Sequence, residues 1–314
     1  MKTVLVTGGT GFLGSWLTLE LRKRHYRVIT VNSADFDLRN WVDAVDMFDQ
    51  VNADLEGHCP DFVIHAAANV GGILYNTNHQ SAILHDNLLM TLNMLEACSM
   101  YPLEKLVLVG SVCAYPSDCP IPFREGDIWA GKPEQSNLAY GISKRVQMEA
   151  GIRYHEEHFV NVVNVVPTNF YGPGDNFDPR FSHVIPAMIR KFDRCLLSGE
   201  EVVLWGDGTP TRDFLYVSDV ARGIVQAMEK VVDPQPINLG SGQEISMRDL
   251  AEKIMIATKC VHCEITWTGE KNLNGQARRV LDVSRATELL GFKPGYSLDE
   301  GLKHTVSHYR NIRP

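Results

Sequence analysis

The chain has 314 residues, of which 44% are hydrophobic and 22% are charged. This length is enough to bury a sizeable core, and the composition is typical of a folded globular protein rather than a disordered chain. The formal net charge of −8 argues against a general nucleic-acid-binding surface, and no apolar run approaches the roughly 20 residues of a membrane-spanning helix.

Short β-branched runs alternate with helical patterns along the first half of the chain. Leu13, Leu17 and Leu21, for example, recur at four-residue steps and predict a helix. The predicted strands are 4–6, 27–31, 62–65, 105–110 and 160–166, and the predicted helices include 12–24, 80–99 and 138–158. Apolar strands separated by helices indicate an α/β protein with a doubly wound parallel sheet covered by helices.

The pattern becomes rich in loops after about Pro167. The predicted helices there, 183–197 and 246–257, are short. We expect residues 1–168 to form a nucleotide-binding domain and residues 169–314 to form mainly a smaller C-terminal α/β substrate lobe. A helix predicted at 217–230 returns to the first domain, so that the segment near 215–240 belongs with it.

The seven cysteines are odd in number and cannot all pair with one another. The N-terminus is typical of a first strand rather than a signal peptide, so we expect reduced thiols and a cytoplasmic protein. Cys260 and Cys263 form one close pair, which encloses His262. A structural zinc needs four ligands and the sequence shows no second cluster at metal spacing, so we expect no metal site.

Three glycines, Gly8, Gly11 and Gly14, follow the first predicted strand and precede a helix. In this position glycines permit a tight turn and a close approach to a pyrophosphate, which the helix N-terminus stabilises. This context predicts a Rossmann-type dinucleotide site. The second strand ends at Asn32, where folds that prefer NAD usually have a carboxylate, and Asp35 follows too late for that role. We therefore expect NADP(H), with Asp37 and Leu38 beside the adenine.

Tyr140 and Lys144 lie four residues apart on a predicted helix and share a face. Ser111 follows the fourth strand, at the sheet edge where this fold binds ligands. The Lys144 ammonium is expected to lower the pKa of Tyr140, so that the phenol exchanges a proton with a substrate oxygen to which Ser111 also hydrogen-bonds. These residues, together with the glycine loop, predict a catalytic site.

With these residues the chain resembles the extended short-chain dehydrogenase/reductase superfamily. Within it, the chain is most similar to the GDP-L-fucose synthases, which are 3,5-epimerase/4-reductases. The segments that carry the resemblance are spread along nearly the whole chain: 65–73, 110–116, 140–144, 167–177, 182–186 and 205–214. The resemblance implies that NADPH reduces the C4 ketone of GDP-4-keto-6-deoxy-D-mannose with Tyr140 as proton donor, giving GDP-L-fucose. It also implies a homodimer in which helices 80–99 and 138–158 pair across the interface.

The resemblance further implies that Cys113 and His183 are the acid/base pair of the epimerisation. The chemistry agrees, because inverting a carbon next to a ketone needs a base on one face and an acid on the other. Cysteine and histidine both titrate within about two units of neutrality. The residues implied for cofactor binding are Gly8, Gly11, Phe12, Leu13, Gly14, Asn32, Asp37, Leu38, Ala66, Ala67, Ala68, Tyr140, Lys144, Pro167 and His183. Those implied for the sugar nucleotide are Asn169, Lys191, Trp205, Arg212, Arg278 and Arg279.

Other functions remain open on the residues alone. They are a 4-reductase without epimerisation, an epimerase/reductase of a related nucleotide-linked 4-keto sugar, and an NAD-dependent 4-epimerase. A 4,6-dehydratase is disfavoured, because Val112 and Cys113 stand where dehydratases place Asp-Glu. A non-catalytic dinucleotide sensor on the same scaffold has no need to keep Tyr140, Lys144 and Ser111 together.

Overall fold

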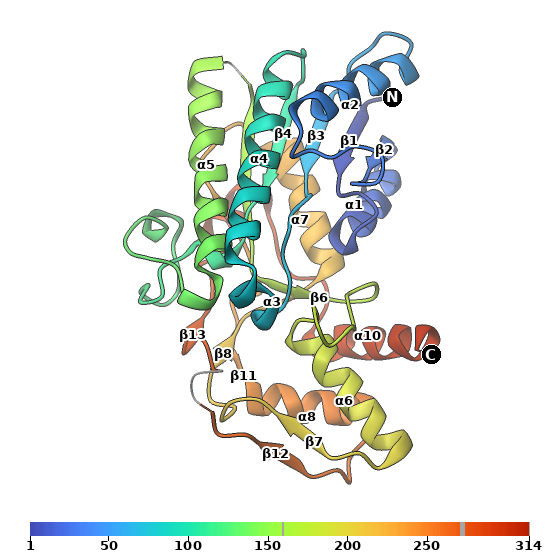
Figure 1. Ribbon diagram of the computed structural model, residues 1–314, viewed down its shortest axis with the longest axis vertical. Coiled ribbons are helices and arrows are strands. Elements are labelled where there is room, and N and C mark those ends of the chain that lie inside the picture. The colour runs from blue at the N-terminus through green and yellow to red at the C-terminus, as the bar shows by residue number, and fades with distance from the viewer. Residues whose placement is uncertain (159, 271–273, 314) are drawn as a thin grey trace.

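A computed structural model describes residues 1–158, 160–270 and 274–313. Six parallel strands form one sheet in the order β10-β5-β4-β3-β1-β2 (Figure 1). Their bounds are β1 (Thr3–Thr7), β2 (Arg27–Val31), β3 (Phe62–His65), β4 (Lys105–Val109), β5 (Val162–Pro167) and β10 (Ile237–Leu239). The chain leaves β1 for β2 on one side and returns to β3 on the other, so ligands are expected at the carboxyl end of β1.

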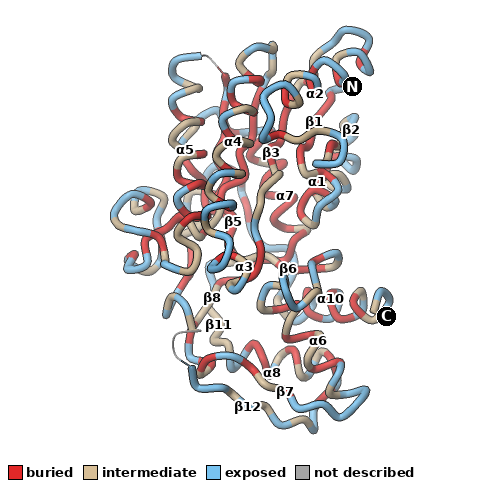
Figure 2. The backbone as a smooth tube through the Cα atoms, in the orientation of Figure 1, coloured by how far each residue is buried: buried red, intermediate tan, exposed pale blue. Residues whose placement is uncertain are grey.

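Helices cover both faces of this sheet. The helices α1 (Phe12–Lys23), α7 (Val217–Lys230) and α9 (Ser284–Leu290) share one apolar core with Val4 and Val6. The helices α2 (Trp41–Asp54), α4 (Gln80–Ser99) and α5 (Leu138–His158) lie on the other face, where α2 and α4 share a core with Leu5. This alternation along β1 follows from the two-residue period of a strand. The strands β1, β3, β4, β5 and β10 are buried along their whole length, whereas the edge strand β2 is partly exposed (Figure 2).

A smaller lobe lies below the carboxyl edge of the sheet in Figure 1. It contains α6 (Val184–Ser198), α8 (Met247–Thr258) and α10 (Leu298–Ile312), packed around Phe192, Leu250 and Leu302. Its strands pair as β7 (Val202–Leu204) with β12 (Ile265–Trp267), and as β8 (Thr211–Arg212) with β11 (Ile245–Ser246) and β13 (Arg278–Arg279). The parallel pair β6 (Asn169–Tyr171) and β9 (Phe214–Tyr216), the helix α3 (Ile73–Asn78) and the short turns η1 (Val112–Ala114), η2 (Glu125–Asp127) and η3 (Gln135–Asn137) complete the described elements.

The structure confirms the predicted α/β class and the parallel sheet. The predicted strands 27–31 and 62–65 and helices 80–99, 138–158 and 217–230 match the observed bounds, and α6 and α8 differ by one residue at each end. The segments α7 and β10 lie far along the chain, yet β10 extends the large sheet and α7 packs against β5. None of the described helices has the length and apolar character to cross a membrane.

Candidate active site

A single cavity of about 1270 Å³ extends from the carboxyl edge of the large sheet into the smaller lobe. The residues predicted for catalysis and cofactor binding all line it, as do Asn169, Lys191, Trp205, Arg212 and Arg279. Arg278 is the exception among the basic residues considered for the pyrophosphate. It is exposed, forms a 2.5 Å ion pair with Glu244 and does not line the cavity.

The glycine loop has no room for side chains. Gly8 has a φ of 67°, and a Cβ there would lie 2.9 Å from the backbone of Ala67. A Cβ at Gly14 would lie 2.1 Å from the carbonyl oxygen of Gly8, so side chains are excluded at both positions. No side chain caps the start of α1 at Gly11, and Phe12 and Leu13 line the cavity. The first backbone N–H groups of α1 are therefore available to an anionic group.

The end of the cavity where the adenosine is expected combines the cation Arg39 with two carboxylates, Asp37 and Asp86. Asn32 is fixed by a turn, in which its Oδ1 accepts from the Ala34 N–H and its Nδ2 donates to Asp35. Arg39 lines the cavity nearby, although it stands well beyond the strand end in the sequence. Its Nε and Nη2 donate to Asp37 at 2.8 and 2.7 Å, which lowers the pKa of that carboxyl, and its Nη1 lies 3.4 Å from Asp86. A guanidinium is thus present for a phosphate, but carboxylates already share it.

Lys144 is deeply buried, with 3% of its surface exposed. Its Nζ donates to the Val109 carbonyl at 2.9 Å and to Oε1 of Gln147 at 2.8 Å. Burial lowers the pKa of Lys144 to about 7. Gln147, which our sequence analysis missed, lies one helical turn after Lys144 and also donates to Val109, so it holds the ammonium in place.

Tyr140 lies beside Lys144, with its ring centroid 5.8 Å from Nζ, but the pKa shift expected from the sequence is wrong in direction. Burial raises the pKa of Tyr140, Cys113 raises it further, and the Ser111 hydroxyl lowers it only in part. Desolvation of the phenolate is the largest cause of this shift, because the ring is almost fully enclosed. The phenol is therefore protonated at neutral pH, as a proton donor must be.

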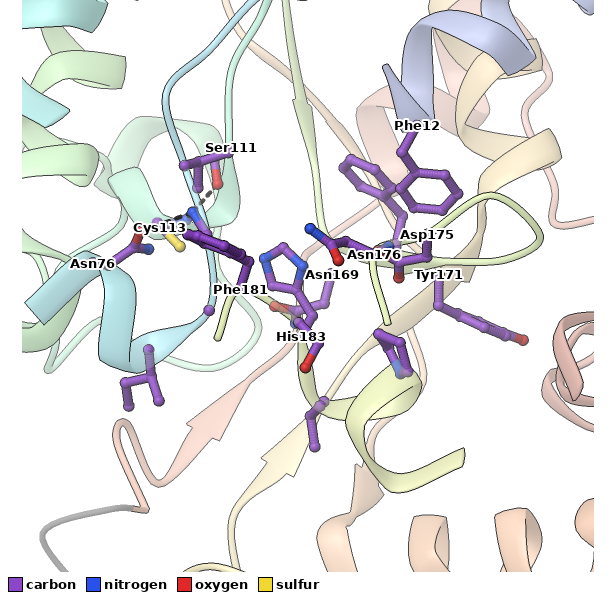
Figure 3. A pocket seen from close by; sticks show the side chains of 18 of the residues that line it. Phe12, Asn76, Ser111, Cys113, Asn169, Tyr171, Asp175, Asn176, Phe181 and His183 are labelled. Atoms are coloured by element: carbon purple, nitrogen blue, oxygen red, sulfur yellow. Dashed lines mark hydrogen bonds between the residues drawn. The ribbon is translucent and has the colours of Figure 1, made fainter. Parts of the chain in front are cut away.

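Ser111 and Cys113 enter the cavity from the loop after β4. The Ser111 Oγ accepts a 3.2 Å hydrogen bond from the Cys113 N–H, which caps the turn η1 (Figure 3). Because the Ser111 oxygen is the acceptor in this bond, its own hydrogen remains available to donate to a group in the cavity. The buried Arg279 places its Nη1 3.7 Å from the Cys113 sulfur. Its guanidinium thus lies where it can stabilise negative charge on the sulfur.

His183 reaches the cavity from the smaller lobe, at the residue that precedes α6. Its side chain makes no capping hydrogen bond to that helix, so capping does not explain the imidazole. Burial lowers the pKa of His183, which is therefore neutral at pH 7 and able to accept a proton. Figure 3 shows His183 and Cys113 approaching the cavity from different segments, with Phe181 nearby.

Two guanidiniums line the part of the cavity within the smaller lobe. Arg212 donates to the carbonyls of Thr211 and Asn274, and burial together with Arg279 lowers its pKa to about 9. Within the described parts of the chain, neither Arg212 nor Arg279 forms an ion pair with a carboxylate. Paired cations without acidic partners suit a sugar-nucleotide pyrophosphate.

The remaining predicted substrate residues lie around these cations. The Nζ of Lys191 donates to the Val203 carbonyl at 2.6 Å and lies 5.4 Å from the Trp205 ring centroid. Burial lowers the pKa of this lysine. Asn169 donates to the Asp213 carbonyl at 3.1 Å, which fixes its amide at the edge of the cavity.

Two further residues of the site were missed by our sequence analysis. Asp175 is buried in the loop after β6, where one oxygen accepts from the Asn176 N–H and the other has no partner in the described chain (Figure 3). Burial raises the pKa of Asp175 to about 7. Gln276 accepts from Arg279 Nε at 3.2 Å and donates to the carbonyls of Pro116 and Ser117, so it ties Arg279 to the loop that follows Cys113. Only the Gly-Pro-Gly-Asp run around Asp175 gave a signal in the sequence, as a tight loop.

The chain is similar to known proteins along nearly its whole length. Residues 4–240 match the model of the NAD dependent epimerase/dehydratase family. GDP-L-fucose synthase 1 of Arabidopsis thaliana is 33% identical over 98% of this chain and 92% of its own, and GDP-L-colitose synthase of Yersinia pseudotuberculosis is 31% identical over 98% of each. The crystal structure of a GDP-L-fucose synthetase from Naegleria fowleri bound to NADP is 27% identical, with a TM-score of 0.88 over 99% of this chain and 94% of that one. The chain therefore belongs to the NAD-dependent epimerase/dehydratase family, in which it is similar along nearly its whole length to GDP-L-fucose synthases.

Proposed function

We propose that this protein is an NADPH-dependent 3,5-epimerase/4-reductase that converts GDP-4-keto-6-deoxy-D-mannose to GDP-L-fucose. The observation that carries the proposal is the presence of two different proton-transfer sets in one cavity. Ser111, Tyr140 and Lys144 form a reductase set, and Cys113 with His183 forms an epimerase set. The similarity to several GDP-L-fucose synthases over nearly the full chain supports the same function.

The residues of the reductase set fit the reduction of a ketone. Bound NADPH supplies the hydride that adds to C4. The Ser111 hydroxyl and the Tyr140 phenol hold the ketone oxygen, and Tyr140 gives its proton to that oxygen as the charge develops. Lys144 stabilises the phenolate that remains, and Gln147 and the Val109 carbonyl keep its ammonium oriented.

The epimerase set acts before the reduction, while the ketone still acidifies its neighbouring carbons. One of the pair Cys113 and His183 removes the proton from C3 or C5, and the other returns a proton to the opposite face. The C–H bond breaks to an enolate whose charge lies on the C4 oxygen, where Tyr140 and Ser111 hydrogen-bond to it. Arg279 supports negative charge on the Cys113 sulfur, and burial keeps His183 neutral and ready to accept.

The proposal extends to the cofactor and the assembly. NADP(H) is supported by the NADP-bound relative and by Arg39 at the adenosine end of the cavity. We place residues 1–168 and the segment near 215–240 in the NADP(H)-binding domain, and most of 169–314 in the sugar-nucleotide lobe.

We further propose a homodimer that forms through α4 and α5. These helices pack side by side and carry the exposed apolar residues Leu92 and Ile142, and sedimentation velocity tests the assembly. The seven unpaired cysteines support a cytoplasmic location.

A related GDP-4-keto sugar is the second candidate substrate. The similarity to GDP-L-colitose synthase, at 31% identity, favours it. Kinetic comparison separates the two substrates. The proposal expects the higher kcat/KM with GDP-4-keto-6-deoxymannose, and a higher kcat/KM with the 4-keto precursor of GDP-L-colitose would favour the second candidate.

The Cys113→Ser variant tests the double function. A serine hydroxyl is far too weak an acid to exchange a carbon-bound proton at neutral pH, whereas reduction depends on Tyr140. In deuterated water the variant should oxidise NADPH while leaving C3 and C5 free of deuterium and uninverted. Wild-type protein in the same solvent is the reference for deuterium entry. Deuterium entry at the wild-type rate in the variant would remove Cys113 from the mechanism.

A further inference from the structure

Three cysteine side chains converge in the smaller lobe, away from the active-site cavity. Cys195, Cys260 and Cys263 place their Sγ atoms within 4.8 Å of one another. None of them lines the cavity. The sequence shows only the Cys260–Cys263 pair, because Cys195 stands 65 residues before Cys260 and the fold alone brings it close. The fold thus adds a third sulfur to the pair that the sequence shows.

The backbone around the cluster presents the sulfurs in an ordered way. Cys195 lies in the last turn of α6, and Cys260 follows α8 through Lys259, whose φ is 60°. The Cys263 N–H donates to the Cys260 carbonyl at 3.3 Å, so the two cysteines close a single turn that leads into β12. Two cysteines separated by two residues in one turn have the spacing that zinc sites use, and the third comes from another segment.

The surroundings suit a soft metal ion. Cys260 is 4% exposed and belongs to the apolar core of the lobe, whereas Cys195 and Cys263 are half-buried and leave a path from solvent. The Cys263 thiol donates to the Cys260 carbonyl at 2.8 Å. Because a metal binds the thiolate form of cysteine, binding displaces the thiol protons.

We propose that Cys195, Cys260 and Cys263 together bind a thiophilic metal ion, Zn²⁺ in the reduced protein. Binding replaces the thiol protons, which pass to solvent, with sulfur–metal bonds, and no electron is transferred. The fourth position is taken by water or by the exposed His262 of the same turn. The ion joins the ends of α6 and α8 to the start of β12, and α6 carries Lys191 into the active-site cavity. The site thus stabilises the substrate lobe without entering the reaction.

The test counts Zn²⁺ bound to the reduced full-length protein in a Cys113→Ser background, which removes the active-site thiol as a competitor. Equilibrium dialysis against Zn²⁺ followed by elemental analysis should give one ion per chain. Loss of an outer-shell partner alone costs 10- to 100-fold in affinity, so Cys195→Ser and Cys263→Ser should each bind at least about 100-fold more weakly. Cys59→Ser, a half-buried cysteine in the other lobe, should bind as the parent does.

Co²⁺ provides the geometric readout. The parent should show a sulfur-to-cobalt charge-transfer band and the intense visible bands of tetrahedral cobalt, and Cys263→Ser should lose them. Zn²⁺ should raise the Tm of the parent but not of the serine variants, whose metal-free Tm and NADPH affinity report whether they fold. Three results would overturn the proposed site. They are equal Zn²⁺ binding by the parent and Cys195→Ser, no bound Zn²⁺ in the parent, and a disulfide in place of metal binding.

Discussion

Replacing Lys144 with methionine should make the protein more stable and much less active. The lysine is buried, and its pKa falls from an ordinary 10.5 to about 7. At about 1.36 kcal/mol per pKa unit, this fall corresponds to about 5 kcal/mol of folding free energy lost at pH 6. Methionine leaves Oε1 of Gln147 without its donor, which costs about 1–3 kcal/mol. The Lys144→Met variant should therefore gain about 2–4 kcal/mol at pH 6, or roughly 3–6 °C in Tm.

The stability gained by Lys144→Met should decrease as the pH rises. Between pH 7 and 10.5 the unfolded lysine holds a proton that the folded one has lost, so wild-type stability from this group rises with pH across that window. By pH 9 only about 2 kcal/mol of the cost remains, and the variant and the wild type should have nearly equal Tm values. Thermal unfolding of both proteins without cofactor at pH 6 and pH 9 measures this difference.

Activity should change in the opposite sense, because the phenolate of Tyr140 loses its cation. We expect kcat/KM to fall at least about 100-fold. Lys105→Met is the matched control: Lys105 is buried, donates to the Met228 carbonyl and has a pKa lowered by burial, but it does not line the cavity. It should leave kcat/KM unchanged. The reasoning would be refuted if Lys144→Met were less stable than the wild type at pH 6. It would also be refuted if the Tm difference between the two proteins were the same at pH 6 and pH 9.

Two further predictions concern the reductase. Tyr140→Phe should lower the reduction rate about 10²- to 10⁴-fold, since the proton donor is lost, while NADPH affinity measured by fluorescence titration stays close to that of the wild type; near-normal turnover would defeat the assignment. The wild type should prefer NADPH to NADH by about tenfold in kcat/KM, or ~1.4 kcal/mol, and Arg39→Ala should abolish the preference because it removes the guanidinium at the adenosine end. A higher kcat/KM for NADH in the wild type would contradict this interpretation of Asn32 and Arg39.

Much of the large sheet was predictable because its signals are local. The apolar runs at 27–31 and 62–65 and the long helices 80–99 and 138–158 match the structure in their bounds. The short strands of the smaller lobe could not be predicted in this way. The pairs β7–β12 and β8–β13 contain two or three residues from each strand and join segments about 60 residues apart. Such strands have too few residues to show a period, and their pairing depends on tertiary packing.

In the candidate site, too, local patterns could be predicted from the sequence and long-range contacts could not. Motif spacing predicted Ser111, Tyr140 and Lys144, and their resemblance to a known family predicted Cys113 and His183. The contact between Arg279 and Cys113 joins residues 166 apart in the sequence, so no local pattern shows it. The expected direction of the Tyr140 pKa shift was also wrong, because the degree of burial is a property of the folded chain.

The central claim, that one cavity both inverts and reduces a 4-keto sugar, is tested most directly by the identity of the product. The purified protein is incubated with GDP-4-keto-6-deoxymannose and NADPH, and the product is analysed by proton NMR. The account predicts GDP-L-fucose, with C3 and C5 inverted and one NADPH consumed for each molecule formed. A product that is reduced at C4 but uninverted at C3 and C5, or a substrate left unchanged, would contradict it.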